Sequence, residues 1–282
     1  MEHKLAVDEY CVMGNPVEHS KSPWIHARFA QLTGQTLHYG KRMVPLDGFA
    51  ASLHAFIASA NGFASGCNVT VPFKFEAFAL AQHASARATL ARAANTLSFS
   101  DDGIHADNTD GLGLVRDIEL NAGVKLAGRN LLLLGAGGAA AGVLGPLLHT
   151  GAAGITVANR SLAKAQELVQ RHAALATLTH TALLACALAD VQGSFDVVIN
   201  ATSTSLSGES VQLPSGVLRR GALAYDLMYG PAAQGFLDWA HARGAQSRDG
   251  LGMLVEQAAE AFFIWRGVRP PSAQVLQELR AL

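Results

Sequence analysis

The sequence predicts an α/β protein of two domains, each built around a mainly parallel sheet. Apolar segments with strand character alternate with segments of helical periodicity in both halves of the chain, which is the pattern of sheets covered by helices. The chain has 282 residues, enough for about two domains. A glycine-rich turn lies near the middle, at residues 135–140, so the stretch before it must form a domain of its own. We expect a first domain over residues 1–110, completed by C-terminal helices in residues 250–282 that pack back on it, and a second over residues 111–249.

The first domain is expected to contain strands, helices and one hairpin. Ser22 followed by Pro23 has the composition of a helix start, with serine as the N-cap and proline at the first helical position. The Asp101-Asp102-Gly103 segment is typical of a hairpin turn. Strands are expected at residues 10–13, 37–44, 67–71, 95–100 and 103–106, and helices at 22–32, at 46–60 and, as one or two segments, at 74–94.

The rest of the chain continues the alternation. A helix over residues 110–121 leads into the second domain, and a helical segment follows the glycine turn. The last two helices, at 251–265 and 272–282, have an amphipathic pattern. Strands are expected at 131–134, 155–158, 195–200 and 222–227, and a further helix at 163–172.

The glycine turn fits the spacing G-x-G-x-x-A at Gly135, Gly137 and Ala140, between two apolar strands. The first glycine permits a tight turn, the second lets backbone approach a pyrophosphate, and the small third residue lets the helix pack on the strand. The helix N-terminus then offers unpaired N–H groups and a positive dipole end to the phosphates. The segment predicts a dinucleotide site.

The residues after the second strand of this unit indicate which dinucleotide binds. NAD sites usually have an acidic residue there, which accepts a hydrogen bond from the ribose 2′-hydroxyl. Here the place holds Asn159 and Arg160, with Lys164 close behind. An arginine attracts a 2′-phosphate and can bond it with two donors. We therefore predict NADP rather than NAD.

Composition argues against several other classes of protein. The net charge is −1, from 21 basic and 22 acidic residues, and no long basic run suggests nucleic acid or an anionic membrane as a partner. The three cysteines are scattered with no CxxC, which fits a reducing cytoplasm, and the start of the chain does not resemble a signal peptide. Residues 130–159 are uncharged, but their glycines and proline fit turns of a buried core rather than a membrane helix. The histidines show no HExxH and no paired Cys/His spacing, so no metal site is expected.

Five clusters of polar residues stand at expected strand ends or helix starts. Taken singly, each has an ordinary structural explanation: Ser22 or Asp110 as a helix cap, Lys74 as a solvated lysine, Gln257 as an exposed helix residue. Together they supply what a small polyhydroxylated acid needs, namely hydroxyls at a helix start for its carboxylate and Asn, Asp and Gln for its hydroxyls. The clusters are residues 19–23, 68–74, 95–96, 108–111 and 249–257.

At nine ordered motifs the chain resembles the shikimate dehydrogenases, of the NADP-dependent bacterial biosynthetic type. The motifs are GNPVxHSxSPxIH at 14–26, NVTVPFK at 68–74, NTL at 95–97, NTDGxG at 108–113, GAGGA at 135–139, NR at 159–160, INATS at 199–203, YDLxY at 225–229 and DGLGMLVxQA at 249–258.

This resemblance implies reversible reduction of 3-dehydroshikimate to shikimate, a step of aromatic amino acid biosynthesis. NADPH would supply hydride, Lys74 and Asp110 would be the catalytic acid–base pair, and closure of the two domains would exclude water. Ser20 and Ser22 would hold the substrate carboxylate. The residues implied around the ring and its hydroxyls are Thr70, Asn95, Asp110, Tyr225 and Gln257. The implied cofactor contacts are Gly135, Ala136, Gly137, Gly138, Ala139, Asn159, Arg160, Ser161, Lys164, Leu223 and Gly250.

The chain departs from the family pattern near the expected cofactor site. Arg92 and Ser205 stand where the family usually has glycine, and Ala86 where it often has an acid. One alternative is a quinate/shikimate dehydrogenase that uses NAD or NADP. Another is a non-catalytic NADP-binding regulator, which would be expected to lack Lys74 or Asp110. A folate-linked dehydrogenase shares the architecture but not the SxSP and NTDG motifs together. The sequence does not distinguish a monomer from a homodimer.

Overall fold

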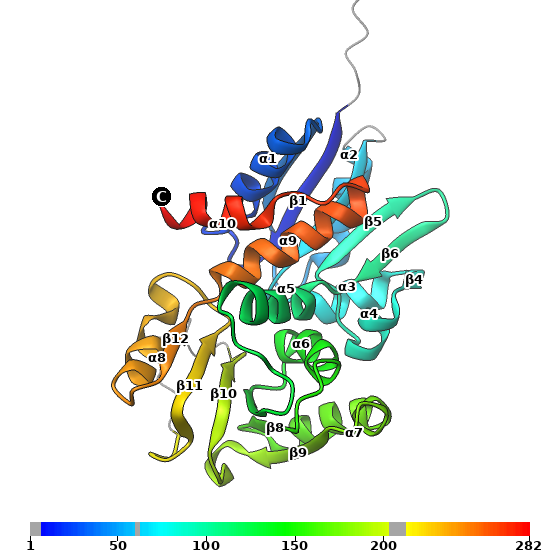
Figure 1. Ribbon diagram of the computed structural model, residues 1–282. Helices are drawn as coiled ribbons and strands as arrows, with labels where there is room; N and C mark the ends of the chain where they lie inside the picture. Colours follow the sequence, from blue (N-terminus) through cyan, green and yellow to red (C-terminus); the bar gives the residue numbers. More distant parts are fainter. Residues whose placement is uncertain (1–6, 60–62, 203–212) are drawn as a thin grey trace, which may run out of the picture. The chain divides into compact units, whose positions relative to one another are not determined.

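The computed structural model describes residues 7–59, 63–202 and 213–282 (Figure 1). The chain forms two compact units: unit 1 consists of residues 1–110 with 255–282, and unit 2 of residues 111–254. Both passages between the units lie within helices, α5 (Asp110–Arg116) and α9 (Leu251–Arg266). The C-terminal return to unit 1 therefore begins inside α9, at Val255, rather than at residue 250.

Unit 1 is built on a six-stranded sheet in the order β2-β1-β3-β5-β6-β4. The first three of these strands are parallel, and β5 pairs antiparallel with both β3 and β6. Consequently β1, β2, β3 and β6 all end at the same edge of the sheet, where β5 begins. The strands are β1 (Asp8–Gly14), β2 (Leu37–Met43), β3 (Ala64–Val69), β4 (His83–Ala84), β5 (Thr96–Ser100) and β6 (Gly103–Asp107).

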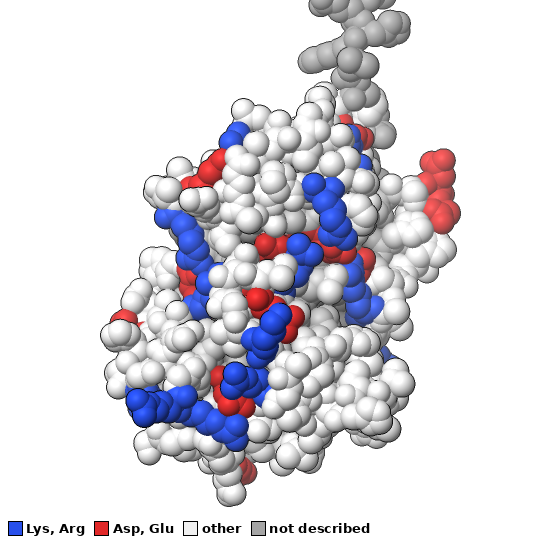
Figure 2. All heavy atoms as spheres, viewed as in Figure 1, with Lys and Arg blue, Asp and Glu red and all other residues white. Residues whose placement is uncertain are grey.

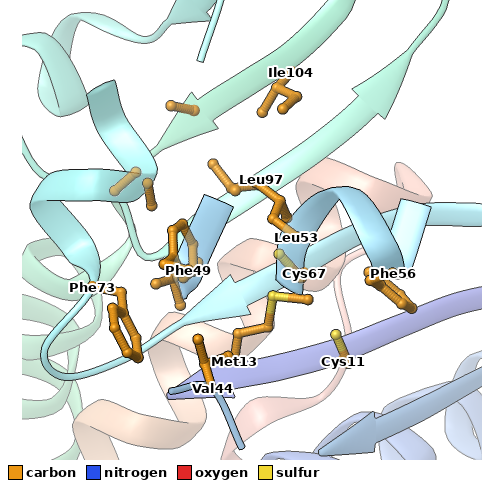
Figure 3. Close-up of a cluster of buried hydrophobic side chains, with 14 residues drawn as sticks. Cys11, Met13, Val44, Phe49, Leu53, Phe56, Cys67, Phe73, Leu97 and Ile104 are labelled. Carbon is orange, nitrogen blue, oxygen red and sulfur yellow. The ribbon is translucent and has the colours of Figure 1, made fainter. Parts of the chain in front are cut away.

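Alternation along β1 creates a core on each face of this sheet, because successive strand side chains point to opposite faces. Cys11 and Met13 belong to the core shown in Figure 3, together with side chains of α2 and α3. Tyr10 and Val12 belong to the other core, in which Tyr10 stacks against Trp265 of α9. The remaining helices of unit 1 are α1 (Ser22–Thr33), α2 (Phe49–Ser59), α3 (Lys74–Leu80), α4 (Ala86–Ala91) and α10 (Ser272–Arg280).

Unit 2 has a fully parallel sheet in the order β12-β11-β10-β7-β8-β9. Numbered within the unit, this is the doubly wound order of dinucleotide-binding domains, which reverses between β7 and β10. Ligands bind such sheets outside the carboxyl ends of the strands at this reversal. The strands are β7 (Asn130–Leu134), β8 (Gly154–Asn159), β9 (Ala182–Ala187), β10 (Phe195–Asn200), β11 (Leu218–Asp226) and β12 (Gln246–Arg248); the helices are α6 (Gly138–Leu148), α7 (Leu162–Leu178) and α8 (Pro231–His241).

The two-domain α/β prediction is confirmed, and several local details are corrected. Ser22 is the first residue of α1 and not its cap; Lys21 holds the cap position, and its side chain makes no capping hydrogen bond. Residues 74–94 contain the short strand β4 between two helices. The expected helix over 110–121 turns π-helical at η1 (Asp117–Asn121). α9 is buried on nearly all sides over Gly252–Phe262, so it lacks the polar face that the sequence suggested.

The strands β9 and β12 and the helix α8 are absent from the sequence prediction. β9 has the sequence ALLACA, which contains no β-branched residue and no polar alternation to mark it as a strand, and β12 is a polar strand of three residues at the sheet edge. Among the described residues, no helix combines the length and apolar composition needed to cross a membrane.

His26, on α1, is expected to make unit 1 less stable in acid. Its imidazole is fully buried and stacks on Tyr39 with ring centroids 4.3 Å apart. Neither ring nitrogen has a hydrogen-bond partner among the described residues, although the Asn68 side chain lies nearby. Burial lowers the pKa of His26 to about 3. In the unfolded chain the imidazole has a pKa of about 6.5, so on acidification it takes up a proton before the folded protein does. The free energy of unfolding is therefore unaffected by His26 above this pH. As the pH falls from there toward the pKa of the folded state, it decreases by up to about 1.4 kcal/mol per pH unit.

This expectation is checked by urea unfolding of the wild type and of His26→Phe at a series of pH values between neutral and moderately acid. The variant should lose stability less steeply on acidification. Equal slopes for the two proteins would show that His26 does not contribute to the acid sensitivity.

Candidate active site

The polar residues expected to bind substrate in unit 1 lie along the sheet edge at which β1, β2, β3 and β6 end. Thr70 directly follows β3, Asn95 directly precedes β5, and Asp110 follows β6 by three residues. Because parallel strands present their carboxyl ends at this edge, it is where ligands of α/β sheets bind.

Lys74 and Asp110 meet at this edge although 36 positions separate them. The Lys74 ammonium donates a hydrogen bond to Asp110 Oδ2 at 2.5 Å, and the two side chains are only 15% and 6% exposed. Lys74 is the first residue of α3, and the preceding Phe73 anchors the helix start by stacking on Phe49 in the core, with centroids 5.2 Å apart (Figure 3). The backbone N–H of Ala94 donates to the Lys74 carbonyl at 2.8 Å. The stacking of Phe73 and the hydrogen bond from Ala94 fix the backbone at the start of α3, and Asp110 then holds the Lys74 ammonium.

Asn95 connects the catalytic pair to the other polar residues of the edge. Its side-chain amide nitrogen lies within hydrogen-bonding distance of three oxygens, which its two N–H groups share: Asp110 Oδ1 at 2.9 Å, Thr109 Oγ1 at 2.9 Å and Gln257 Oε1 at 3.0 Å. The side-chain oxygen of Asn95, Oδ1, accepts from the Thr109 backbone N–H at 2.8 Å. Asn95 thus holds one oxygen of the Asp110 carboxylate and leaves the other for Lys74. Gln257 is buried here and is not an exposed helix residue.

Two residues outside the predicted site set extend this network. The Tyr39 hydroxyl donates to Asn68 Oδ1 at 2.7 Å. Asn68 Nδ2 in turn donates to the backbone carbonyl of Asn95 at 3.1 Å and to Thr96 Oγ1 at 3.1 Å. Burial raises the pKa of Tyr39 well above its ordinary value, so the hydroxyl remains a donor. Asn68 belongs to the polar cluster at residues 68–74, which the sequence analysis had identified. Tyr39 belongs to none, and only the pairing of strands brings it here.

Ser20 and Ser22 follow β1 and lie together at the start of α1. The Ser20 hydroxyl donates to Ser22 Oγ at 3.2 Å and accepts from the Ser22 backbone N–H at 3.3 Å. The Ser22 side chain also interacts with the Tyr39 hydroxyl. Thr70 packs over Gly14 so closely that a Cβ on this glycine would lie 2.2 Å from Thr70 Cγ2. The fold thus joins Ser22, through Tyr39 and Asn68, to the Asn95 network.

The glycine turn of unit 2 lies at the carboxyl end of β7, next to the reversal of strand order. Gly135 has φ +107°, which L side chains rarely adopt, and a Cβ there would lie 3.0 Å from the Ala201 carbonyl oxygen. Gly137 is the N-cap of α6, and apart from the adjoining backbone no described heavy atom lies within 4 Å of the place its Cβ would occupy. Ala136, Gly138 and Ala139 complete the turn and begin the helix. The open space beside helix N–H groups fits a pyrophosphate.

The basic residues predicted to select NADP lie at the neighbouring strand end. Asn159 ends β8, and its amide donates to the Ser161 carbonyl at 3.0 Å. Arg160, Ser161 and Lys164 are exposed at the start of α7, and within the described part of the chain neither cation pairs with a carboxylate. A cavity of about 340 Å³ is lined by Arg160, Ala187, Leu188 and Ala189. A guanidinium beside a cavity at the carboxyl ends of β8 and β9 suits a phosphate-bearing ribose.

Leu223 and Tyr225 do not reach the end of their strand. Both lie inside β11 and are only 3% and 0% exposed. The Tyr225 hydroxyl donates to Asp117 Oδ2 at 2.7 Å and accepts from the Met253 N–H at 3.3 Å, so it already has two partners within unit 2. Gly250 does lie at the strand end: its N–H donates to the Met228 carbonyl at 2.8 Å, and a Cβ on it would lie 2.2 Å from the Leu227 oxygen.

The second tyrosine of the YDLxY motif is better placed than the first. Tyr229 follows the end of β11 by three residues and is partly exposed, as are Leu227 and Met228 before it. The rule that ligands bind beyond the carboxyl ends of strands favours this segment over Leu223 and Tyr225. The YDLxY motif contains Tyr229, but the sequence does not show that β11 ends before this residue.

The departures from the family pattern lie on or near α4, except for Ser205, which is outside the described residues. Ala86 begins α4, and the preceding Ser85 caps the helix by accepting from the Ala88 N–H at 3.2 Å. Arg92 ends α4 with φ +50°. This left-handed conformation costs a non-glycine residue about 1–2 kcal/mol.

Arg92→Gly is therefore expected to stabilise the protein by about 0.5–1 kcal/mol, because glycine adopts a positive φ freely but loses more entropy on folding. A shift of the urea midpoint measures the effect. The matched control is Ala91→Gly, one residue earlier in the right-handed helix, which should lower stability by about 0.5–1 kcal/mol. A lower midpoint for Arg92→Gly would contradict the interpretation.

Family models match most of the chain in sequence order. The shikimate dehydrogenase substrate binding domain matches residues 12–97, the shikimate/quinate 5-dehydrogenase model residues 118–208, and the shikimate 5′-dehydrogenase C-terminal domain residues 250–280. None of these matches depends on the geometry described above, yet together they cover most of the residues that form it.

Similar proteins match over nearly their full length. The shikimate dehydrogenase (NADP(+)) of Paracidovorax citrulli is 67% identical over 277 residues, covering 98% of each chain. That of Acidovorax sp. (strain JS42) is 66% identical over 276 residues, covering 98% of this chain and 97% of the relative. The crystal structure of shikimate 5-dehydrogenase from Thermus thermophilus, in complex with NADP(H) and shikimate, superimposes with a TM-score of 0.80 at 30% identity, covering 98% of this chain and 99% of that one. The chain belongs to the shikimate dehydrogenase family.

Proposed function

We propose that this protein catalyses the reversible, NADPH-dependent reduction of 3-dehydroshikimate to shikimate; its relatives are named shikimate dehydrogenase (NADP(+)). The observation that carries the proposal is the ion pair between Lys74 and Asp110. It combines a proton donor with a carboxylate that positions it, and it lies among the side chains expected to bind a polyhydroxylated acid.

The residues of unit 2 fit NADP. The open backbone at Gly137 suits the pyrophosphate, and Arg160 with Lys164 suits the 2′-phosphate. When bound, NADPH supplies the hydride that reduces the carbonyl carbon at C3 of the substrate.

Lys74 and Asp110 perform the proton chemistry in this proposal. As negative charge develops on the C3 oxygen, the Lys74 ammonium donates a proton to it; in the reverse direction, the neutral amine accepts the hydroxyl proton. Asp110 holds the ammonium at 2.5 Å, while Asn95 restrains the other carboxylate oxygen at 2.9 Å. The pair is mostly shielded from water, which strengthens its electrostatic effect on the substrate oxygen.

Substrate binding is assigned to the rest of the unit 1 edge. Ser20 and Ser22 hold the substrate carboxylate through hydroxyl groups at the start of α1. Thr70, Asn95 and Gln257 bind the ring hydroxyls. The family resemblance implies Tyr225 as a further substrate contact, but its buried hydroxyl favours a structural role, and we assign the motif's substrate contact to Tyr229 instead.

The decisive assay measures oxidation of shikimate and of quinate with NADP⁺ and with NAD⁺, in four combinations. Shikimate with NADP⁺ should give the highest kcat/KM. Comparable or higher activity with quinate and NAD⁺ would favour the alternative of a quinate/shikimate dehydrogenase. Binding of NADP⁺ without turnover of either substrate would favour a non-catalytic regulator.

Arg160→Ala should raise KM for NADPH by about 10-fold while KM for NADH changes little, because only NADPH carries the 2′-phosphate that a guanidinium can bond with two donors. Steady-state kinetics with both cofactors measures the preference. Arg171→Ala is the matched control, since Arg171 lies on α7, the helix that follows Arg160, and pairs with Glu167 at 2.8 Å. An unchanged NADPH/NADH preference in Arg160→Ala would refute the assignment.

We further propose that the protein acts in the cytoplasm on a small-molecule substrate, as a monomer or a homodimer. The scattered free cysteines support this location. Light scattering of the purified protein decides between the two oligomeric states.

A further inference from the structure

Three side chains of unit 1 that have no part in the proposed reaction converge at the tip of the β5–β6 hairpin. They are His83 on β4, Asp102 in the hairpin turn and His105 on β6. One nitrogen or oxygen atom from each lies within 4.8 Å of the other two. Figure 2 shows acidic side chains projecting at this tip, where the chain has Asp101 and Asp102.

Strand pairing brings the two histidines together. β4 pairs in parallel with β6, and His83 stands directly opposite His105 in the register, so both side chains leave the same face of the sheet. Their rings lie 4.5 Å apart at an angle of 23°. Gln82 fastens the pairing, because its side-chain oxygen accepts from the Ile104 N–H at 2.7 Å.

The hairpin turn brings the carboxylate to both rings. Asp102 Oδ1 lies 2.9 Å from His105 Nε2, and Oδ2 lies 3.4 Å from His83 Nε2. Gly103, with φ +122°, lets the chain turn between Asp102 and His105. The Ser100 hydroxyl also donates to Asp102 Oδ1, at 2.6 Å.

These separations are close to those that a bound metal requires. Zinc–ligand bonds of about 2.0–2.1 Å in a tetrahedron place neighbouring ligand atoms about 3.3 Å apart. The nearly parallel rings must tilt so that each points its Nε2 at a shared ion. Both histidine side chains are close to half exposed, and rotation about their second side-chain torsion is soft, so little resists this movement.

We propose that His83, Asp102 and His105 form a surface binding site for one divalent transition-metal ion such as Zn²⁺. Two imidazoles and a carboxylate suit zinc, copper or nickel, whereas magnesium and calcium prefer an all-oxygen set. Three protein ligands leave a coordination position for water. The sequence search for metal motifs did not find this site, because its ligands come from two strands and a turn rather than from one helix or loop.

The ion would act as a clamp on unit 1. β4 lies between α3, which begins with Lys74, and α4, while β6 leads to the segment that ends in Asp110. Bridging β4 to the hairpin therefore joins the two chain segments that carry the catalytic pair. Binding to the folded state alone stabilises it by mass action, so metal should raise the melting temperature.

The proposal is tested by isothermal titration of Zn²⁺ into the full chain, free of any histidine tag. We expect one saturable equivalent. His83→Asn, Asp102→Asn and His105→Asn should each weaken binding at least about 10-fold, which is the lower range for loss of a group supporting a metal site. All three positions are on the surface, so the variants should fold normally, which circular dichroism checks.

The matched control is His38→Asn. His38 forms an exposed histidine–carboxylate pair with Glu9 at 2.6 Å in the same unit, but in the described part of the chain no third ligand joins it. This variant should bind Zn²⁺ as the wild type does. The proposal is overturned if the wild type takes up no stoichiometric zinc, if the three ligand variants keep wild-type affinity, or if His38→Asn weakens binding as much as they do.

Discussion

Replacing Lys74 with alanine is expected to lower kcat for shikimate oxidation by about 10²–10⁴-fold, the usual contribution of a general acid or base. The change removes the only proposed proton donor but leaves the serines, Thr70 and Gln257 that bind the substrate, so KM for shikimate should change much less. Steady-state kinetics in both directions measures the two parameters separately. A loss of kcat at nearly constant KM is the signature of an interaction made only in the transition state.

The control for this prediction is Lys125→Ala, which removes an exposed lysine from a loop of unit 2. It should leave kcat unchanged. Asp110→Asn extends the test: because Asp110 and Lys74 act as one unit, the double variant should lose little more activity than the worse single variant. A wild-type kcat in Lys74→Ala would refute the catalytic role of the lysine. If the free-energy losses of the two single variants add up to that of the double variant, the pair does not act together.

Replacing Asp117 with alanine is expected to lower the free energy of unfolding by about 3–5 kcal/mol. Asp117 is fully buried, and its carboxylate accepts from Arg248 at 2.6 and 2.7 Å and from the Tyr225 hydroxyl at 2.7 Å. The alanine variant leaves the guanidinium and the hydroxyl without their acceptor in a tightly packed place, where a Cβ on Gly252 would lie 1.9 Å from Asp117 Oδ1. Urea unfolding followed by circular dichroism measures the loss.

Glu167→Ala is the matched control for Asp117→Ala. Glu167 pairs with Arg171 at 2.8 Å in the same unit, but its side chain is 69% exposed. An exposed pair contributes about 0.2–1 kcal/mol, so the two variants should differ by several-fold in their effect. Similar losses for both would mean that burial does not set the strength of the Asp117 network.

The contrast between Tyr225 and Tyr229 illustrates where sequence reasoning stopped. The family resemblance of the YDLxY motif implies its first tyrosine, Tyr225, as the substrate contact. Hydrogen bonds to Asp117 and Met253 show that the hydroxyl of Tyr225 is engaged inside unit 2. Which tyrosine of the motif lies beyond the strand depends on where β11 ends, and strand ends are poorly marked in a sequence.

The strands at the sheet edges, β4, β9 and β12, are a second example. β4 and β12 are too short or too polar to show a period, and β9 (ALLACA) contains no β-branched residue to mark it as a strand. They form because a neighbouring strand offers hydrogen bonds, which is a property of the assembled sheet. The candidate metal cluster depends on one of them, since only the pairing of β4 with β6 places His83 opposite His105.

The sequence by itself determined the fold class, the dinucleotide turn and the preference for NADP, because these depend on local needs: alternation of strand and helix periods, glycines where backbone must turn or approach a ligand, and the charge of the residues after one strand. Only the tertiary structure decided which side chains meet. Lys74 and Asp110, the Asn95 network and the Asp117 network are contacts between distant segments, and strand order and burial, rather than spacing along the chain, set the distances between them.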